Sequence, residues 1–368
     1  MLAGPGLYAL HCMSIPTRTV PVPASLAAIA SRVERRLADV LDAEIDRWGA
    51  LDRDLVEPLT TLRRFVVSSG KRLRPAFCYW GFVGAGGDPD DPAIVDAGAA
   101  FELLQAFALV HDDVMDGSSM RRGARTVHLG YGDRHLLEGW RGEARRFGEG
   151  VAILIGDLAH VYADSFLRAA PPAAAAIWNE LRIELNVGQY LDVLGTVRGA
   201  TDLASARRIA RYKSGKYTIE RPLHVGAAYA GRYEDLHEAL SRYGDPLGEA
   251  FQLRDDMLGA FGDASVTGKP VGDDLREGKP TSLLAIASSR ATGEQRALLA
   301  LVGSQDLTAR DIAAIQGVFV DTGAVSELEA TIHHLAAEAI DAIDQAPICD
   351  DARGALVELA EYVAWRER

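Results

Sequence analysis

Cysteine, proline and excess positive charge are all scarce in this sequence. Its 368 residues include three cysteines, Cys12, Cys78 and Cys349, which stand far apart and in no metal-binding spacing. Separated cysteines in an odd number disfavour a disulfide framework and favour free thiols in a reducing cytoplasm. The 39 lysines and arginines are outnumbered by 52 aspartates and glutamates, which gives a net charge of −13. That acidic balance argues against a general nucleic-acid-binding protein.

Long hydrophobic runs are not expected in the sequence either. No apolar run approaches the roughly 18 to 20 residues needed to cross a bilayer. Residues 1–24 contain four prolines and no basic segment ahead of a hydrophobic one, so a secretory signal is not expected. We therefore predict a mobile N-terminal tail over residues 1–24.

The rest of the sequence indicates one all-α domain over residues 25–368. Only 15 prolines interrupt long stretches rich in alanine and leucine, and no series of alternating strands occurs. Apolar spacings of three and four residues predict helices. The predicted positions are two helices over 26–66, one each over 94–116, 151–170, 173–195, 202–228 and 233–261, and four or five over 282–366. A surface segment with one short helix is expected over 117–150, and a polar loop over 262–281.

Two acidic clusters end apolar helical stretches. In the first, Asp112 and Asp116 share one predicted helix face, with Asp113 between them and no lysine or arginine within four residues of Asp112. The second cluster is Asp255 and Asp256, far away along the chain. Each could be a solvated helix end. Facing each other, they could hold several Mg²⁺ ions, which prefer few oxygen ligands with water and phosphate completing the shell. Such a site would bind a diphosphate.

Positive charge is gathered into short clusters. These are Lys71, Arg72 and Arg74 in one loop, Arg121 with Arg122, Lys213 with Lys216 on one predicted helix face, and Lys269 with Lys279 around an acidic loop. Any one of them could be a solvated rim. Arginine forks and lysine charges both fit phosphate oxygens. Acidic and basic clusters together imply an anionic substrate with at least two phosphate groups.

The predicted helix that carries Asp112 also carries an apolar stripe. Phe101, Leu104, Gln105 and Ala108 lie on the same face as Asp112 at helical spacing. A cavity along this face would be lined mostly by hydrocarbon, although ordinary core packing is the commoner cause of such a stripe.

These residues resemble the motifs of the trans-isoprenyl diphosphate synthases, also called polyprenyl synthetases, and among them the geranylgeranyl diphosphate synthases. The matching segments are GKRLRP (70–75), ELLQ (102–105), DDVMD (112–116), RRG (121–123), GQYLD (188–192), KS (213–214), QLRDD (252–256) and GKPVGDDLREGK (268–279). The resemblance implies a single-domain helical bundle around a central cavity, the isoprenoid synthase fold. It also implies a homodimer.

The activity implied by the resemblance is head-to-tail prenyl transfer. An allylic diphosphate, such as dimethylallyl, geranyl or farnesyl diphosphate, ionises, and the double bond of isopentenyl diphosphate attacks the cation. By this resemblance Asp112, Asp116 and Asp255 are ligands of three Mg²⁺ ions, while Asp113 and Asp256 act through water. An apolar pocket would protect the cation from hydrolysis.

The resemblance also assigns the basic clusters. Arg121, Lys213 and Lys269 would hold the allylic diphosphate, and Lys71, Arg74, Gln105 and Arg122 would hold isopentenyl diphosphate; many relatives have histidine at the position of Gln105. Lys279 would be a further substrate-binding residue. Gln252, Ser214 and the Lys213 carbonyl would face the developing cation.

One position departs from the family pattern. The second acidic motif usually ends in a third aspartate, and this chain has Gly259 there. We expect activity to survive because Asp255 is the implied ligand. Asp263 could replace the missing carboxylate only through a loop rearrangement.

Product length is inferred from the residues just before Asp112. Ala108, one turn below Asp112, leaves the pocket open, and each further turn adds about 5.4 Å, close to one isoprene unit. Phe107, together with Ala108, resembles the pattern of geranylgeranyl diphosphate synthases, and Phe101 and Leu104 lie deeper. The expected main product is geranylgeranyl diphosphate (C20), with farnesyl diphosphate (C15) as the alternative.

Three other functions fit the sequence less well. A class I terpene cyclase would need a different second metal motif and has no use for the basic loop at 70–75. A non-catalytic subunit of a heteromeric synthase tends to lose the first aspartates, which are intact here. A di-iron helical bundle would need Glu-x-x-His pairs, and Glu220/His224 and Glu329/His333 are one residue too long.

Overall fold

The protein is described here from a computed structural model that covers residues 21–68, 70–199, 202–262 and 271–366. Its helices up to the middle of the chain are α1 (Ala24–Gly49), the 3₁₀ turn η1 (Arg53–Leu55), α2 (Val56–Val67), α3 (Leu73–Gly84), α4 (Pro92–Asp116), α5 (Val127–Leu137), α6 (Ala144–Phe166) and α7 (Pro172–Arg198). Then follow α8 (Leu203–Ala210), the π-helix η2 (Arg211–Glu220), α9 (Arg221–Tyr229), α10 (Tyr233–Phe261), α12 (Asp273–Glu277), α13 (Ser282–Arg290), α14 (Gly293–Leu299), α15 (Ala309–Asp321), α16 (Ala324–Asp344) and α17 (Asp350–Trp365). The prediction of an all-α fold is confirmed.

Most predicted helices are found close to their expected places. The break near Asp52 separates α1 from α2, and five helices follow residue 281. The surface segment contains the short helix α5 and a small hairpin, β1 (Met120–Arg121) paired antiparallel with β2 (Ala124–Arg125). Of the predicted tail, residues 1–20 lie outside the described residues, and α1 already begins at Ala24.

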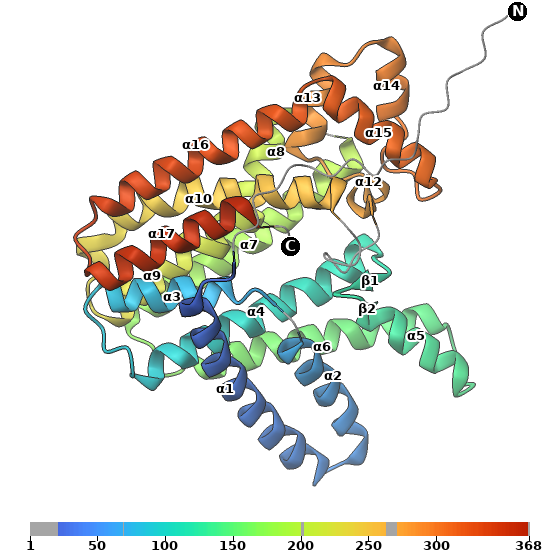
Figure 1. Ribbon diagram of the computed structural model, residues 1–368. Coiled ribbons are helices and arrows are strands. Elements are labelled where there is room, and N and C mark those ends of the chain that lie inside the picture. The colour runs from blue at the N-terminus through green and yellow to red at the C-terminus, as the bar shows by residue number, and fades with distance from the viewer. Residues whose placement is uncertain (1–20, 69, 200–201, 263–270, 367–368) are drawn as a thin grey trace, which may run out of the picture.

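The helix α4 lies at the centre of the bundle beside α6 (Figure 1). Asp91 caps its start by accepting a hydrogen bond from the Ala93 backbone at 2.8 Å, and Gly117 ends it with a left-handed φ of 67°. The expectation that no apolar stretch reaches membrane-spanning length is wrong for α4, which is long and apolar enough. Most of that apolar stretch is buried inside the bundle, as in the core helix of a globular domain.

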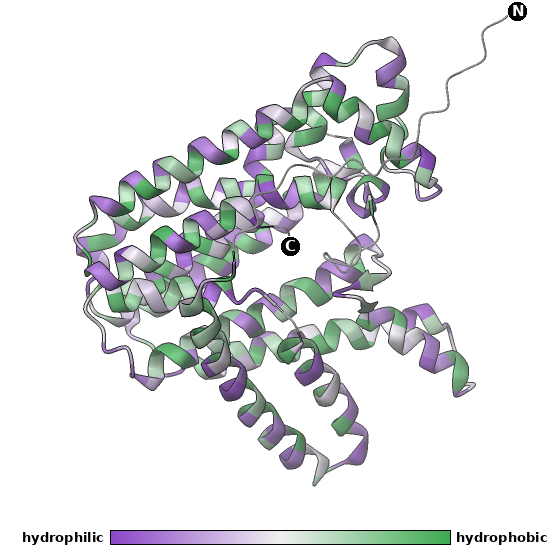
Figure 2. Cartoon of the chain, viewed as in Figure 1, coloured by the Kyte–Doolittle hydropathy of each residue, from purple (hydrophilic) through white to green (hydrophobic). Residues whose placement is uncertain are grey.

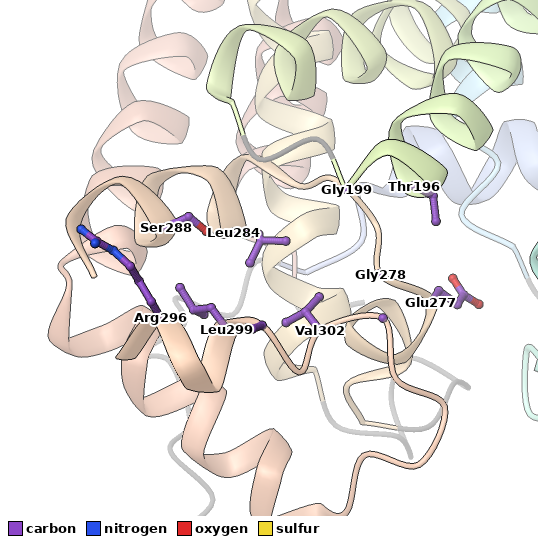
Figure 3. Close-up of a pocket in the computed structure, with 11 residues that line it drawn as sticks. Thr196, Gly199, Glu277, Gly278, Leu284, Ser288, Arg296, Leu299 and Val302 are labelled. Atoms are coloured by element: carbon purple, nitrogen blue, oxygen red, sulfur yellow. The ribbon is translucent and has the colours of Figure 1, made fainter. Parts of the chain in front are cut away.

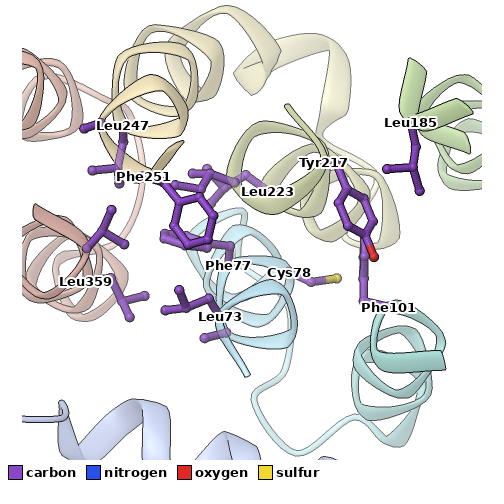
Figure 4. Packing of buried hydrophobic residues seen from close by; sticks show 14 of the residues in the cluster. Leu73, Phe77, Cys78, Phe101, Leu185, Tyr217, Leu223, Leu247, Phe251 and Leu359 are labelled. Carbon is purple, nitrogen blue, oxygen red and sulfur yellow. The ribbon is translucent and has the colours of Figure 1, made fainter. Parts of the chain in front are cut away.

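One hydrophobic core cluster takes in residues of the described helices α1 to α7 and α9 to α17 and of the π-helix η2. Figure 4 shows Phe77 of α3, Phe251 of α10 and Leu359 of α17 meeting in it. The outer helix α16 instead alternates hydrophilic and hydrophobic residues along its length (Figure 2), as expected for a helix with one buried face.

The predicted helix over 202–228 is one continuous rod made of three parts, α8, η2 and α9. Its middle part is a π-helix, which the periodicity did not predict. This part packs tightly against α7, where a Cβ on Gly188 would lie 2.4 Å from the Lys213 backbone nitrogen. The close approach brings Lys213 to the side chains of α7, and π-helical segments often occur at functional sites.

Candidate active site

The first acidic cluster is neutralised by basic residues from other elements. Asp112 accepts hydrogen bonds from Lys213 Nζ at 3.0 Å and from Gln189 Nε2 at 2.9 Å. Lys213 also donates to Asp192 of α7 at 2.6 Å. Burial raises the pKa of Asp112, but the charges of Lys213, Lys279 and Arg121 outweigh it and hold this pKa below its usual range. Asp112 is therefore an anion.

Arg121 connects the β hairpin to the same cluster. Its Nε donates to Asp113 at 2.8 Å, and its guanidinium lies 3.5 Å from Asp112. Asp113 is almost fully buried and turned towards Arg121. Asp113 is therefore an ion-pair partner of Arg121.

Lys279 links the first cluster to the short helix α12. Its Nζ lies 3.2 Å from Asp116, 2.7 Å from Glu277 and 3.6 Å from Asp274. Burial raises the pKa of Asp116 to about 6, with Lys279 opposing and Asp112 adding to the shift. The surrounding carboxylates keep Lys279 protonated, with a pKa well above its ordinary value despite burial.

The two carboxylates of the second cluster, Asp255 and Asp256, have different surroundings. Asp255 pairs with Arg366 and lies 3.9 Å from Lys71 Nζ. Asp256 is buried, accepts from Gln252 Nε2 at 2.8 Å and from the Ser282 backbone at 3.2 Å. Burial raises the pKa of Asp256 to about 7. Asp255 is thus the more accessible of the two.

Two arginines in the motifs face away from this site. Arg254 donates to Glu329 and to the Ala364 carbonyl, each at 2.8 Å. Arg72 has a left-handed φ of 51° and is buried against Glu34 and Glu102. Both arginines therefore stabilise the fold.

The two predicted isopentenyl diphosphate arginines lie beside aromatic rings. Arg74 donates to Thr218 at 2.8 Å, and its guanidinium lies 4.3 Å from the centre of the Tyr217 ring. Its Nε is buried without a hydrogen-bond partner among the described residues, which leaves a donor for a phosphate oxygen. Arg122 donates to the Phe65 carbonyl at 3.2 Å, and burial lowers its pKa to about 10.

The predicted chain-length residues divide into two groups. Phe101 and Leu104 are fully buried, and the Phe101 ring meets Trp178 of α7 edge-on at 5.3 Å. Phe107 is partly buried and stacks on His160 of α6 at 4.9 Å, and Ala108 is also partly buried. Phe101 and Leu104 belong to the hydrophobic core, and Phe107 and Ala108 pack against it.

The remaining predicted site residues that the structure describes lie outside the ion-pair network at Asp112. Gln105 and Ser214 lie partly exposed on α4 and η2. Lys269 lies outside the described residues, as does Asp263. Lys216 does not join Lys213 at Asp112; it pairs instead with Glu184 at 3.5 Å and Glu220 at 3.2 Å. Both lysines contact α7, Lys213 at Asp192 and Lys216 at Glu184, so they lie towards the same neighbouring helix but pair with different acids.

Sequence reasoning assigned no role to several side chains at the site. Gln189 and Asp192 stood in a quoted motif, and Asp274 and Glu277 stood in the acidic loop between Lys269 and Lys279. Their place in these motifs could have identified them as site residues. Nothing in the sequence identified Arg366, because it follows Asp255 by 111 residues.

The donor set suits Mg²⁺ and a diphosphate. Asp112, Asp116 and Asp255 offer carboxylate oxygens only, which hard divalent cations prefer. Within the described ranges no group of three or more histidines, cysteines or acids is close enough to hold a metal by itself. Mg²⁺ usually binds one or two carboxylates plus substrate phosphates, so the phosphates would be part of the site.

A cavity of about 440 Å³ lies beside this site, between the end of α7 and the helices α12 to α14. Figure 3 shows Glu277 at one side of it, with Leu284, Leu299 and Val302 lining its apolar part. Glu277 accepts a hydrogen bond from Ser118 at 2.7 Å. The four chain-length residues are not in the lining of this cavity.

Comparison with known proteins places the chain in a family. The family model for polyprenyl synthetases matches residues 57–318. A geranylfarnesyl diphosphate synthase from Aeropyrum pernix is 30% identical, over 82% of this chain and 92% of that protein. A geranylgeranyl diphosphate synthase from Mycobacterium tuberculosis is 32% identical, over 79% of this chain and 81% of that protein. A (2E,6E)-farnesyl diphosphate synthase from the same organism is also 32% identical, over 81% and 80%.

A solved structure has the same fold along nearly the whole chain. The geranylgeranyl pyrophosphate synthase from Corynebacterium glutamicum, complexed with isoprenyl diphosphate and magnesium, superposes with a TM-score of 0.86. It is 36% identical, over 95% of this chain and 100% of that chain. The chain belongs to the polyprenyl synthetase family and is a trans-prenyltransferase.

Proposed function

We propose that the chain condenses isopentenyl diphosphate head-to-tail with an allylic diphosphate, in a Mg²⁺-dependent reaction whose main product is geranylgeranyl diphosphate. The observation that carries the proposal is the neutralised carboxylate cluster at the end of α4. There Asp112 and Asp116 lie within 3.2 Å of Lys213 and Lys279. Acids for a metal and bases for a phosphate thus share one site.

In this proposal Asp112, Asp116 and Asp255 hold three Mg²⁺ ions, and Asp113 and Asp256 support them. The ions supply charge stabilisation for the departing diphosphate. Lys213 is partly buried and positioned by Asp112 and Asp192, so it presents a fixed positive charge as the allylic carbon–oxygen bond breaks. Arg121 and Lys269 bind the same diphosphate.

The second substrate occupies the basic loop. Lys71, Arg74 and Arg122 bind the diphosphate of isopentenyl diphosphate, with Gln105 as a further contact. Lys279, which pairs with Asp116, is a further substrate-binding residue. Its double bond forms the new carbon–carbon bond to the allylic cation. A proton is then lost to the released diphosphate, which restores the double bond. Ser214, Gln252 and the Lys213 carbonyl face the cation with oxygen atoms.

The C20 product is proposed from Phe107 and Ala108, with Leu104 and Phe101 deeper along α4. The relatives carry names for C15, C20 and C25 synthases, so the family alone leaves the chain length open. The specific alternative is farnesyl diphosphate.

We also propose a homodimer in the cytoplasm. Large hydrophobic side chains are exposed along α6 and α7, at Ile153, Leu154, Val161, Ile183, Val187, Tyr190, Val193 and Val197. Exposed apolar side chains gathered on two helices favour a protein–protein contact, and a second copy of the chain is the proposed partner. Free thiols at Cys78 and Cys349 agree with a reducing compartment.

The test incubates the purified chain with Mg²⁺, isopentenyl diphosphate and each of dimethylallyl, geranyl and farnesyl diphosphate, and sizes the prenyl alcohols after dephosphorylation. Geranylgeraniol is expected from every starter. The Asp255→Ala variant should lose Mg²⁺-dependent turnover, and near-wild-type activity would refute the role of Asp255. Sedimentation equilibrium of the same protein tests the dimer.

A further inference from the structure

The space beside Gly259 is filled by a carboxylate from another helix. Gly259 lies on α10, one turn after Asp255. A Cβ at this position would lie 1.8 Å from Asp274 Oδ2 and 2.7 Å from Asp274 Cγ. No real pair of atoms approaches so closely, so the Asp274 carboxylate occupies its place only because residue 259 has no side chain.

Asp274 is held in this place by the geometry of α12. Gly272 precedes the helix with a left-handed φ of 71°, a conformation that glycine adopts without strain. The turn directs the first residues of α12 towards α10. Asp274 lies close enough to the second cluster for its charge to raise the pKa of Asp256.

The same carboxylate also reaches the first cluster through a lysine. Asp274 Oδ1 lies 3.6 Å from Lys279 Nζ, and that nitrogen lies 3.2 Å from Asp116. Asp274 therefore stands between the acidic end of α4 and the acidic end of α10, where the proposed function places the metal–diphosphate complex.

We propose that Asp274 supplies the third carboxylate of the second metal-binding cluster, from α12 instead of α10. This inference rests on the proposed function, because it concerns the same Mg²⁺–diphosphate complex. It explains how the chain keeps three carboxylates there although position 259 is glycine. A purely structural role, as a partner for Lys279 alone, is the competing explanation, since Lys279 also has Asp116 and Glu277.

The test moves the carboxylate from one helix to the other. In each purified variant, Mg²⁺ is titrated at a fixed concentration of inorganic pyrophosphate, and the midpoint of the rise in melting temperature is read. Asp274→Ala should raise the Mg²⁺ midpoint about 10- to 100-fold, the usual effect of removing a carboxylate that supports a metal site. Gly259→Ala should act in the same direction because its methyl group displaces the Asp274 carboxylate.

The double variant Gly259→Asp/Asp274→Ala separates the two explanations. A Cβ at 259 lies 3.4 Å from Asp274 Cβ, an ordinary contact, so both new side chains fit. Recovery of the Mg²⁺ midpoint to within about threefold of wild type supports the proposal. If Asp274 acts only as a partner for Lys279, the single variants keep the wild-type midpoint, and that result overturns the proposal.

Two controls complete the design. Gly317→Ala places the same methyl group in the middle of α15, where a Cβ meets no atom within 4 Å, and it should leave the midpoint unchanged. Asp112→Asn tests the proposed function itself. If Asp112→Asn abolishes the Mg²⁺-dependent shift while the Asp274 and Gly259 variants do not, this inference fails and the proposed function stands. If Asp112→Asn has no effect, the proposed function fails first.

Discussion

Arg366 pairs with Asp255 across the 111 residues that separate them in sequence. The Arg366 side chain is fully buried, donates to the Val363 carbonyl at 2.7 Å and to the Phe251 carbonyl at 3.1 Å, and stacks on the Phe251 ring at 4.1 Å. The guanidinium of Arg366, just after α17, thus forms an ion pair with the carboxylate that we propose as a Mg²⁺ ligand, and it would compete with the metal ion for that carboxylate.

Removing this charge should favour the metal. In the Arg366→Gln variant, Asp255 keeps only the longer contact with Lys71, so the Mg²⁺ concentration that gives half-maximal activity should fall several-fold. Thermal unfolding in the absence of Mg²⁺ should show lower stability, because a buried partner is lost. The control is Arg353→Gln, whose guanidinium donates to the Ile343 and Asp344 carbonyls at the end of α16 and not to Asp255. An unchanged Mg²⁺ dependence in Arg366→Gln would contradict the competition.

Lys213 and Lys216 form a matched pair for testing the electrostatic role of the π-helix. Lys213→Gln removes the cation at Asp112 and should lower kcat about 100-fold or more, the usual cost of losing one group that stabilises developing charge. Lys216→Gln removes a cation that pairs with Glu184 and Glu220 and should lower the melting temperature with little effect on kcat. Steady-state kinetics and thermal unfolding of both variants measure the two effects. Equal losses of kcat in the two variants would contradict the prediction, because they would show that contact with Asp112 is not what makes Lys213 important for kcat.

The acidic ends of the two helices could be predicted from the sequence, but the side-chain contacts that join them to other helices could not. The four-residue spacing of Asp112 and Asp116 follows from helical geometry, and α4 is found where periodicity placed it. The substrate-binding role of Lys213 was assigned from the family resemblance, whereas its contact with Asp112 depends on a π-helix that the sequence pattern did not predict. Hydrophobic periodicity indicates which helix face is buried, but it does not detect a local change from α-helix to π-helix.

The basic loop shows a second limit of sequence reasoning. The sequence alone does not show which of the three cations Lys71, Arg72 and Arg74 faces the site. A single left-handed residue, Arg72, turns its own side chain into the core beside Glu102, and Arg74 instead reaches Thr218. The long-range partners Arg366 and Asp274 were unpredictable for the same reason, because their contacts depend on how distant helices pack.

Acid should destabilise the protein through His224. Burial lowers the pKa of His224 to about 4, whereas an unfolded histidine has a pKa of about 6.5. Between these values the unfolded chain binds the proton and the folded chain does not, so stability is lost as pH falls from about 6.5 towards 4. The His224→Gln variant lacks this proton and should lose less stability over that interval. Urea unfolding at several pH values measures the difference, and parallel curves for the two proteins would contradict it.

Product length should respond to bulk at Ala108. The Ala108→Phe variant places a ring one turn below Asp112, which should stop chain growth early and shift the main product from C20 to C15 or shorter. Ala108→Ser adds little volume and should keep the wild-type product. The reciprocal change, Phe101→Ala, opens space above Trp178, whose ring is fixed by a 2.9 Å hydrogen bond to Asp164, and should allow longer products. Chromatography of the dephosphorylated products separates these outcomes. If all three variants make the same products as wild type, the growing chain does not run along this face of α4.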